Sequence, residues 1–174
     1  MDFPVLPAEE PPGSLGDARE LLDAYLDYYR GTVLRKLDGL GEEELRGSRL
    51  PSGWTPLELL KHLTWVERRW LRWGFAAEAT DEPWGDQGPD GAWHVPAEES
   101  IEDVKAAYVE QCERSRQIAA GVPLARRART GGRFATPDEA PTLGWILFHV
   151  LQEYARHAGH LDIARELIDG TVGE

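Results

Sequence analysis

The segment 143–162, LGWILFHVLQEYARHAGHLD, decides the fold that we expect for this chain. Apolar residues recur along it at steps of three and four, which is the period of one face of an α-helix. A Pro141-Thr142 pair precedes the pattern and Gly170 follows it. We therefore predict one long helix from about Pro141 to Asp169, and no segment shows a strand pattern of comparable length.

Four polar side chains share one stripe of this helix: His149, Glu153, His157 and His160. Their positions along the helix place them within roughly 80° of arc, at about 100° per residue. Glu153 and His157 form an i, i+4 pair, the spacing at which two side chains can converge on a single ion. The shorter step to His160 turns it sideways from that axis. We interpret His149 and His160 as groups that support the ligands or line a pocket, and core packing is an equally good alternative.

Three further amphipathic helices are expected upstream, because the same apolar period recurs over residues 17–40, 55–74 and 100–121. Long connections containing glycine and proline, residues 75–99 and 122–140, separate the last three helices. The sequence thus predicts an all-α fold, a four-helix bundle with a long crossover between helices 2 and 3. Such a crossover makes those two helices roughly parallel.

The length of 174 residues suits one domain with a single core. Several prolines within residues 1–16 predict an extended N-terminal arm, and we assign residues 17–174 to one helical domain. The only cysteine, Cys112, excludes an intramolecular disulfide and cannot supply a zinc-finger quartet. Cys112 lies on the apolar face of the third helix, so we expect it in the core.

Charge and hydropathy exclude several classes of partner. The formal net charge of −12 would repel a phosphate backbone, which argues against nucleic acid. No window approaches the roughly 20 uninterrupted apolar residues of a membrane span. The N-terminus lacks a basic region followed by an apolar run, so we see no secretory signal and expect a cytoplasmic protein.

His62 is the histidine best placed to complete a metal site with Glu153 and His157. It lies on the inner stripe of the second predicted helix, whereas His94 lies in a Gly- and Pro-rich loop. Taken alone, His62 fits a hydrogen-bonded core histidine equally well, and Glu153 with His157 fits an ordinary pair on a solvated face. Together they favour a metal site, because burying all three costs several kcal/mol unless an ion or a full set of hydrogen bonds compensates.

Two other features are candidates for binding a small molecule. The connection before the last helix carries Arg126, Arg127, Arg129 and Arg133, the one basic patch of the chain. It can bind an anionic substrate, although a solvated charged loop is the commoner interpretation. Tryptophan is abundant, and packing is the commoner role of the helical tryptophans. For Trp84 and Trp93 in the crossover, packing and lining a pocket are equally good interpretations.

The stretches 54–67, WTPLELLKHLTWVE, and 143–162 resemble the DinB-like superfamily. More narrowly, they resemble the actinobacterial branch associated with mycothiol-dependent metalloenzymes, which includes mycothiol transferases and maleylpyruvate isomerase. The arginine-rich composition is consistent with a GC-rich actinobacterial source. The resemblance implies a four-helix bundle in which His62, Glu153 and His157 hold a divalent metal. Many members carry histidine where Glu153 stands, whereas relatives similar to maleylpyruvate isomerase carry glutamate.

The resemblance also implies an activity. A metal, with zinc first and nickel, iron or manganese as alternatives, would activate mycothiol for transfer to a small electrophile or for its isomerisation. His149, His160 or Asp162 would orient ligands or move protons, and the arginine loop would hold an acidic thiol or substrate. Related bundles often dimerise, so a homodimer is a candidate assembly.

Two other functions remain open at this point. In a metal-dependent hydrolase, the open coordination position would bind water instead of a thiol. In a stress-response module, the metal and pocket would hold a small molecule without chemistry. Turnover without any thiol distinguishes the first of these, and tight retention of an unchanged ligand distinguishes the second.

Overall fold

The computed structural model describes residues 7–173, and the all-α prediction is confirmed. The elements within that range are α1 (Ala18–Leu37), α2 (Glu42–Arg46), α3 (Pro56–Glu67), the π-helical segment η1 (Arg68–Phe75), α4 (Ile101–Ala119) and α5 (Leu143–Asp169). The only β structure in the described part is two isolated bridges, Gln87–Trp93 and Arg127–Thr142. No helix in the same range is long and apolar enough to cross a membrane.

The helices begin where capping side chains appear in the sequence. Thr55 accepts a hydrogen bond from the backbone N–H of Glu58, whose carboxylate in turn accepts one from the N–H of Thr55. This reciprocal capping box, with Pro56 at the first helical position, starts α3 as predicted. At the other end of the chain, Gly170 adopts a left-handed backbone with φ of 77° and ends α5.

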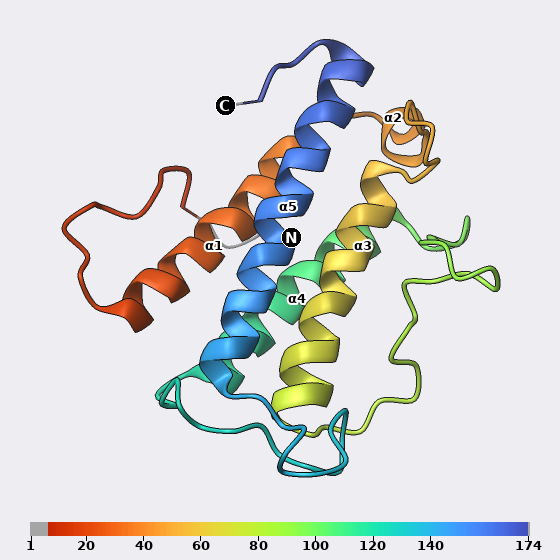
Figure 1. Ribbon diagram of the computed structural model, residues 1–174. Coiled ribbons are helices and arrows are strands. Elements are labelled where there is room, and N and C mark those ends of the chain that lie inside the picture. The colour runs from red at the N-terminus through yellow and green to blue at the C-terminus, as the bar shows by residue number, and fades with distance from the viewer. Residues whose placement is uncertain (1–6, 174) are drawn as a thin grey trace.

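The four long helices pack side by side, with α5 between α1 and α3 (Figure 1). Lys61 near the start of α3 pairs with Glu99, just before α4, and Arg114 in the second half of α4 pairs with Glu78, just after η1. α3 and α4 therefore run in the same direction, joined by the crossover. The connection over residues 76–100 passes along the outside of α3 (Figure 1). Its side chains contact the site described below.

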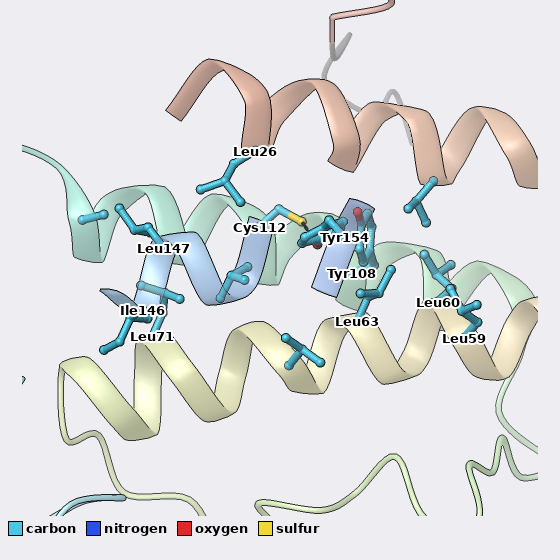
Figure 2. Packing of buried hydrophobic residues seen from close by; sticks show 14 of the residues in the cluster. Leu26, Leu59, Leu60, Leu63, Leu71, Tyr108, Cys112, Ile146, Leu147 and Tyr154 are labelled. Atoms are coloured by element: carbon cyan, nitrogen blue, oxygen red, sulfur yellow. Dashed lines mark hydrogen bonds between the residues drawn. The ribbon is translucent and has the colours of Figure 1, made fainter. Parts of the chain in front are cut away.

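The core is formed by large side chains that are almost completely buried. Figure 2 shows it between the helices, and the labelled members are Leu26, Leu59, Leu60, Leu63, Leu71, Tyr108, Cys112, Ile146, Leu147 and Tyr154. Burial of such side chains stabilises the fold by about 1.5–3 kcal/mol each. Cys112 is buried in this cluster, as expected from its place on the apolar face of its helix.

A charged network crosses the core and was not anticipated from the sequence. Glu67 of α3 is fully buried and accepts two hydrogen bonds from the Arg30 guanidinium of α1, at 2.8 and 3.0 Å. The Tyr154 hydroxyl of α5 donates to the same carboxylate at 2.7 Å, and the Cys112 thiol lies 3.6 Å from it. One buried carboxylate thus joins four helices.

The second predicted helix differs from the structure in its last two turns. Residues beyond Glu67 form π-helical turns, and the N–H of Ala76 bonds the carbonyl of Leu71 at 2.9 Å, five residues back. A π turn inserts an extra residue, which rotates the following side chains around the axis. The ordinary helical period, continued from His62 and Val66, predicts that Trp73 faces the core. That prediction is wrong, because Trp73 is only partly buried and lies outside the core cluster.

Two smaller outcomes concern the N-terminal half. The short helix α2 lies between the first two predicted helices and was not expected. Residues 7–17 contain no helix, and the carbonyl of Pro7 accepts a hydrogen bond from Arg35 of α1, so this part of the arm lies against the bundle. The remainder of the predicted arm, residues 1–6, falls outside the described residues.

Candidate metal centre

The structure brings together the three residues expected to bind a metal. His62 projects from α3, Glu153 and His157 project from α5, and one ligand atom of each lies within 4.8 Å of the other two. The side chains are 13%, 23% and 8% exposed, respectively. The cluster therefore lies at the edge of the core, shielded from bulk water but accessible to a small molecule.

The packing of α3 against α5 explains this convergence. On α3, Leu59, Leu63 and Val66 are buried, and His62 occupies the border of the same apolar stripe. On α5, Tyr154 and Leu161 are buried, which leaves Glu153 and His157 one turn apart along the adjoining edge. The two borders meet where the helices touch.

The Glu153 carboxylate lies between two histidines. Its Oε2 is 3.3 Å from His157 Nε2, and its Oε1 is 3.4 Å from His149 Nε2. The hydrogen bond with His157 lowers the pKa of Glu153, although partial burial opposes this shift. Glu153 is thus ionised near neutral pH, in the form that binds cations.

Asp86 in the crossover orients His62. Its Oδ2 is 2.9 Å from His62 Nδ1, and Arg69 of η1 donates to both carboxylate oxygens at 2.6 and 3.1 Å. Asp86 is fully buried; burial alone would raise its pKa, but the hydrogen bonds from His62 and Arg69 lower it on balance. The ionised carboxylate holds the proton of His62 on Nδ1, which leaves Nε2 free to bind an ion.

His160 makes the equivalent contact to His157. Their Nδ1 atoms are 3.2 Å apart, so one ring donates and the other accepts. Partial burial lowers the pKa of His160 and favours its neutral form. His62 and His157 thus both have their Nδ1 atoms engaged, as metal-ligating histidines commonly do.

Two tryptophan pairs border the cluster along α5. Trp93 stacks on the His62 ring at 4.1 Å between ring centres and lies 6.3 Å from Trp54. The second pair lies nearer the start of α5, around His149. Trp70 of η1 lies 4.3 Å from the His149 ring, and Trp145 of α5 stacks on that ring at 5.2 Å. Aromatic side chains therefore flank the candidate ligands on both sides.

The other residues singled out in the sequence have different surroundings. Asp162 pairs with Lys36 of α1, which occupies its carboxylate away from the three ligands. The side chains of Arg126, Arg127 and Arg129 line a separate cavity beside Phe75 and Pro123, which none of the three ligands borders. Arg133 alone of the four arginines reaches the aromatic border of the site, with its guanidinium carbon 4.1 Å from the centre of the Trp70 ring.

Sequence reasoning missed Asp86 and Arg69. Asp86 lies in an irregular loop between Gly85 and Gln87, where no helical or strand period indicates which residues turn inward. Arg69 lies in the π-helical segment, where the ordinary helical period no longer applies. A single acidic residue in a Gly- and Pro-rich crossover carries no signal that distinguishes it from its solvated neighbours.

The family model described as mycothiol-S-transferase matches residues 21–170, which run from α1 to the end of α5. The chain belongs to the mycothiol-S-transferase family. The resemblance to DinB-like, mycothiol-associated enzymes is thereby confirmed, and a mycothiol-related function follows from it. No curated protein matches the chain. The match includes all three candidate ligands as well as Asp86 and His149.

Proposed function

We propose that this protein is a metal-dependent mycothiol transferase in which His62, Glu153 and His157 hold one divalent ion. The observation that carries the proposal is their convergence from two helices, with ligand atoms within 4.8 Å, in a chain of the mycothiol-S-transferase family. The substrate class that we propose is mycothiol together with a small electrophile.

The residues fit a divalent ion in their chemistry. Two imidazole nitrogens and one carboxylate oxygen suit zinc, and also nickel, iron or manganese, and three protein ligands leave positions open for a substrate. Asp86 and His160 each contact the Nδ1 of a candidate ligand, which fixes the two rings. We propose zinc first, because this donor set is a common one for zinc in enzymes.

A bound divalent cation supplies Lewis acidity, which lowers the pKa of a thiol and favours the nucleophilic thiolate. We propose that His149 accepts the thiol proton. Burial lowers the pKa of His149, so its ring is neutral and able to accept a proton at pH 7, and its Nε2 lies 3.4 Å from Glu153. His160 and Asp162, the other candidates for this role, already contact His157 and Lys36.

The transfer step is a nucleophilic substitution. The mycothiol sulfur forms a bond to the electrophilic carbon, the leaving group departs with the bonding electron pair, and the thiol proton remains on His149 until solvent removes it. The flanking pairs Trp54–Trp93 and Trp70–Trp145 limit water at the reacting atoms and hold the substrates beside the cluster.

A direct spectrophotometric assay of thiol transfer tests the proposal. Zinc-loaded protein is mixed with mycothiol and 1-chloro-2,4-dinitrobenzene, and thioether formation is followed by absorbance, with His62→Ala and metal-free protein as comparisons. We expect catalysed thioether formation that falls at least 100-fold in both comparisons. A rate no higher than that of mycothiol alone, or a His62→Ala variant as active as the native protein, would contradict it. Turnover of esters or amides without any thiol would instead favour a hydrolase.

A further inference from the structure

Arg133 forms, with Trp70, Trp145 and His149, a small surface beside the candidate metal ligands that we call the Arg133 face. The Arg133 guanidinium lies over the Trp70 ring at 4.1 Å. Trp70 is 5.3 Å from Trp145 and 4.3 Å from the His149 ring. Trp145 is 52% exposed, so a molecule in solution can reach this face.

The backbone fixes Arg133 in this place. Its N–H donates to the carbonyl of Trp73 at 3.1 Å, and the N–H of Arg129 donates to that of Phe75, so the loop is attached to η1 at two points. At the preceding Gly132 a side chain would not fit, because a Cβ atom would lie 2.2 Å from the Trp73 carbonyl oxygen. The position of the cation is therefore set by the fold and not by a mobile loop.

Arg133 has no anionic partner among residues 7–173. No carboxylate lies within 4.0 Å of its guanidinium, whereas the buried Arg30 pairs with Glu67 and Asp27, and the buried Arg69 pairs with Asp86. Its Nη1 atom is buried and has no hydrogen-bond partner in the same range. Leaving a buried donor unsatisfied costs about 1–3 kcal/mol, and more for a charged group. Nη1 itself is closed to solvent, but Arg133 is only partly buried, so an anion that reached the accessible part of the side chain would supply the counter-charge that residues 7–173 do not.

A short chain of contacts connects this cation to the candidate ligands. Trp70 touches both Arg133 and His149, and His149 Nε2 lies 3.4 Å from the Glu153 carboxylate. The Trp70 and Trp145 rings are tilted by 55° to each other, so a flat molecule placed in the angle between them would have one end toward Arg133 and the other toward the metal centre. Arginine suits such a site, because its planar fork donates two parallel hydrogen bonds to a carboxylate while its face stacks on an aromatic ring.

We propose that the Arg133 face binds the electrophile of the transferase reaction and selects a planar substrate that carries a carboxylate. The assignment of this ligand as the electrophile rests on the function proposed above. Arg133 holds the carboxylate, Trp70 and Trp145 hold the flat body, and the reactive carbon points toward His149 and the three ligands. Arg133 is thus a specificity-determining residue, and the other three loop arginines are not.

Binding of a matched pair of probes tests this inference separately from turnover. trans-Cinnamate and its uncharged methyl ester are titrated into zinc-loaded full-length protein, with tryptophan fluorescence as the readout. Arg133→Gln removes the charge, and Arg133→Lys keeps it without the planar fork. Arg129→Gln is the matched control, because it removes an exposed charge from the same loop. Circular dichroism verifies that each variant is folded.

We expect the native protein and Arg129→Gln to bind cinnamate more tightly than the ester. Arg133→Gln should weaken cinnamate binding about 10-fold or more and change ester binding less than about twofold, with Arg133→Lys intermediate. Equal affinity of native protein and Arg133→Gln for cinnamate, or no cinnamate binding at all, would overturn the inference. Cinnamate binding that depends on Arg133, in a protein that never transfers mycothiol, would reject the transferase function but leave the anion subsite standing.

Discussion

At the scale of single residues, the site depends on groups that fix the two histidine rings. The Asp86 carboxylate contacts His62 Nδ1 at 2.9 Å and is itself held by Arg69. Without such a contact the His62 ring can rotate, and its proton can move to the nitrogen that an ion needs. Asp86 therefore acts through His62 and touches no substrate.

The first prediction concerns this contact. Asp86→Asn should weaken zinc affinity about 10- to 100-fold, because the amide removes the charge that stabilises the correct form of His62. Competition with a chromogenic chelator measures the affinity, and Asp81→Asn is the control, since Asp81 is exposed in the same crossover. Zinc affinity unchanged in a folded Asp86→Asn variant would show that the carboxylate does not position His62.

The second prediction concerns pH. Burial lowers the pKa of His62, His149 and His160, so folding favours their neutral forms. As the pH falls, the unfolded chain therefore binds protons at a higher pH than the folded protein does. The stability that they contribute is complete above about pH 6.5 and declines as the pH falls through their folded pKa values. The free energy of unfolding of metal-free protein, from urea titration, should thus be lower at pH 5 than at pH 7.5.

His149→Gln provides the comparison for this pH dependence. It removes one of the three titrating rings, so the loss of stability between pH 7.5 and pH 5 should be smaller than in the native protein. A free energy of unfolding that is constant or higher at pH 5 would contradict the assigned direction of the shifts.

At the scale of elements, the buried Arg30–Glu67 pair ties α1 to α3 and reaches α4 and α5 through Cys112 and Tyr154. Burial alone would raise the pKa of Glu67, but Arg30 lowers it on balance. The pair is thus ionised inside the core. Removing Glu67 would leave the buried Arg30 with only the partly exposed Asp27, 2.8 Å away, as its anionic partner.

The third prediction follows from that pair. Glu67→Ala should destabilise the protein by about 3–5 kcal/mol, whereas the double variant Arg30→Met with Glu67→Leu should recover much of the loss, because it leaves no unpaired charge. Urea unfolding of the single and double variants gives both values. A double variant no more stable than Glu67→Ala would show that the cost comes from lost packing and not from the charge on Arg30.

Comparison of the elements shows which parts of the fold could be predicted from the sequence. Helices whose capping residues and apolar period agree, such as the one beginning at Thr55-Pro56, could be placed from the sequence. The π-helical segment could not, because its extra residue breaks the period on which the prediction depends. The partners of Glu67 could not either, since Arg30 lies in a different helix and long-range pairing leaves no local pattern.

At the scale of the whole molecule, the candidate centre joins α3 to α5 across the edge of the core. His62 could be predicted from its place on the inner stripe of its helix, and Glu153 with His157 from their i, i+4 spacing; the family resemblance then indicated that the three share one ion. Asp86 and the Arg133 face depend on how two long connections fold back on the bundle, which the sequence leaves open.

The fourth prediction concerns the stabilising effect of an ion bound between α3 and α5. An ion that binds only the folded chain stabilises it by about 2.7 kcal/mol when its concentration is 100 times the dissociation constant. For a chain of this length that should raise the melting temperature by roughly 5–10 °C. Differential scanning calorimetry with and without zinc measures the rise. His157→Ala should show almost none, and an equal rise in that variant would place the ion elsewhere.

The metal content of purified protein tests the central claim most directly. Native protein and the variants His62→Ala and His94→Ala are stripped with a chelator, reloaded with zinc, desalted and measured by elemental analysis. His94 is an exposed loop histidine, so its variant controls for loss of any histidine. We predict one zinc ion per chain in the native protein and in His94→Ala, and close to none in His62→Ala. Native protein without zinc, or a His62→Ala variant that retains one ion per chain, would contradict the proposed centre.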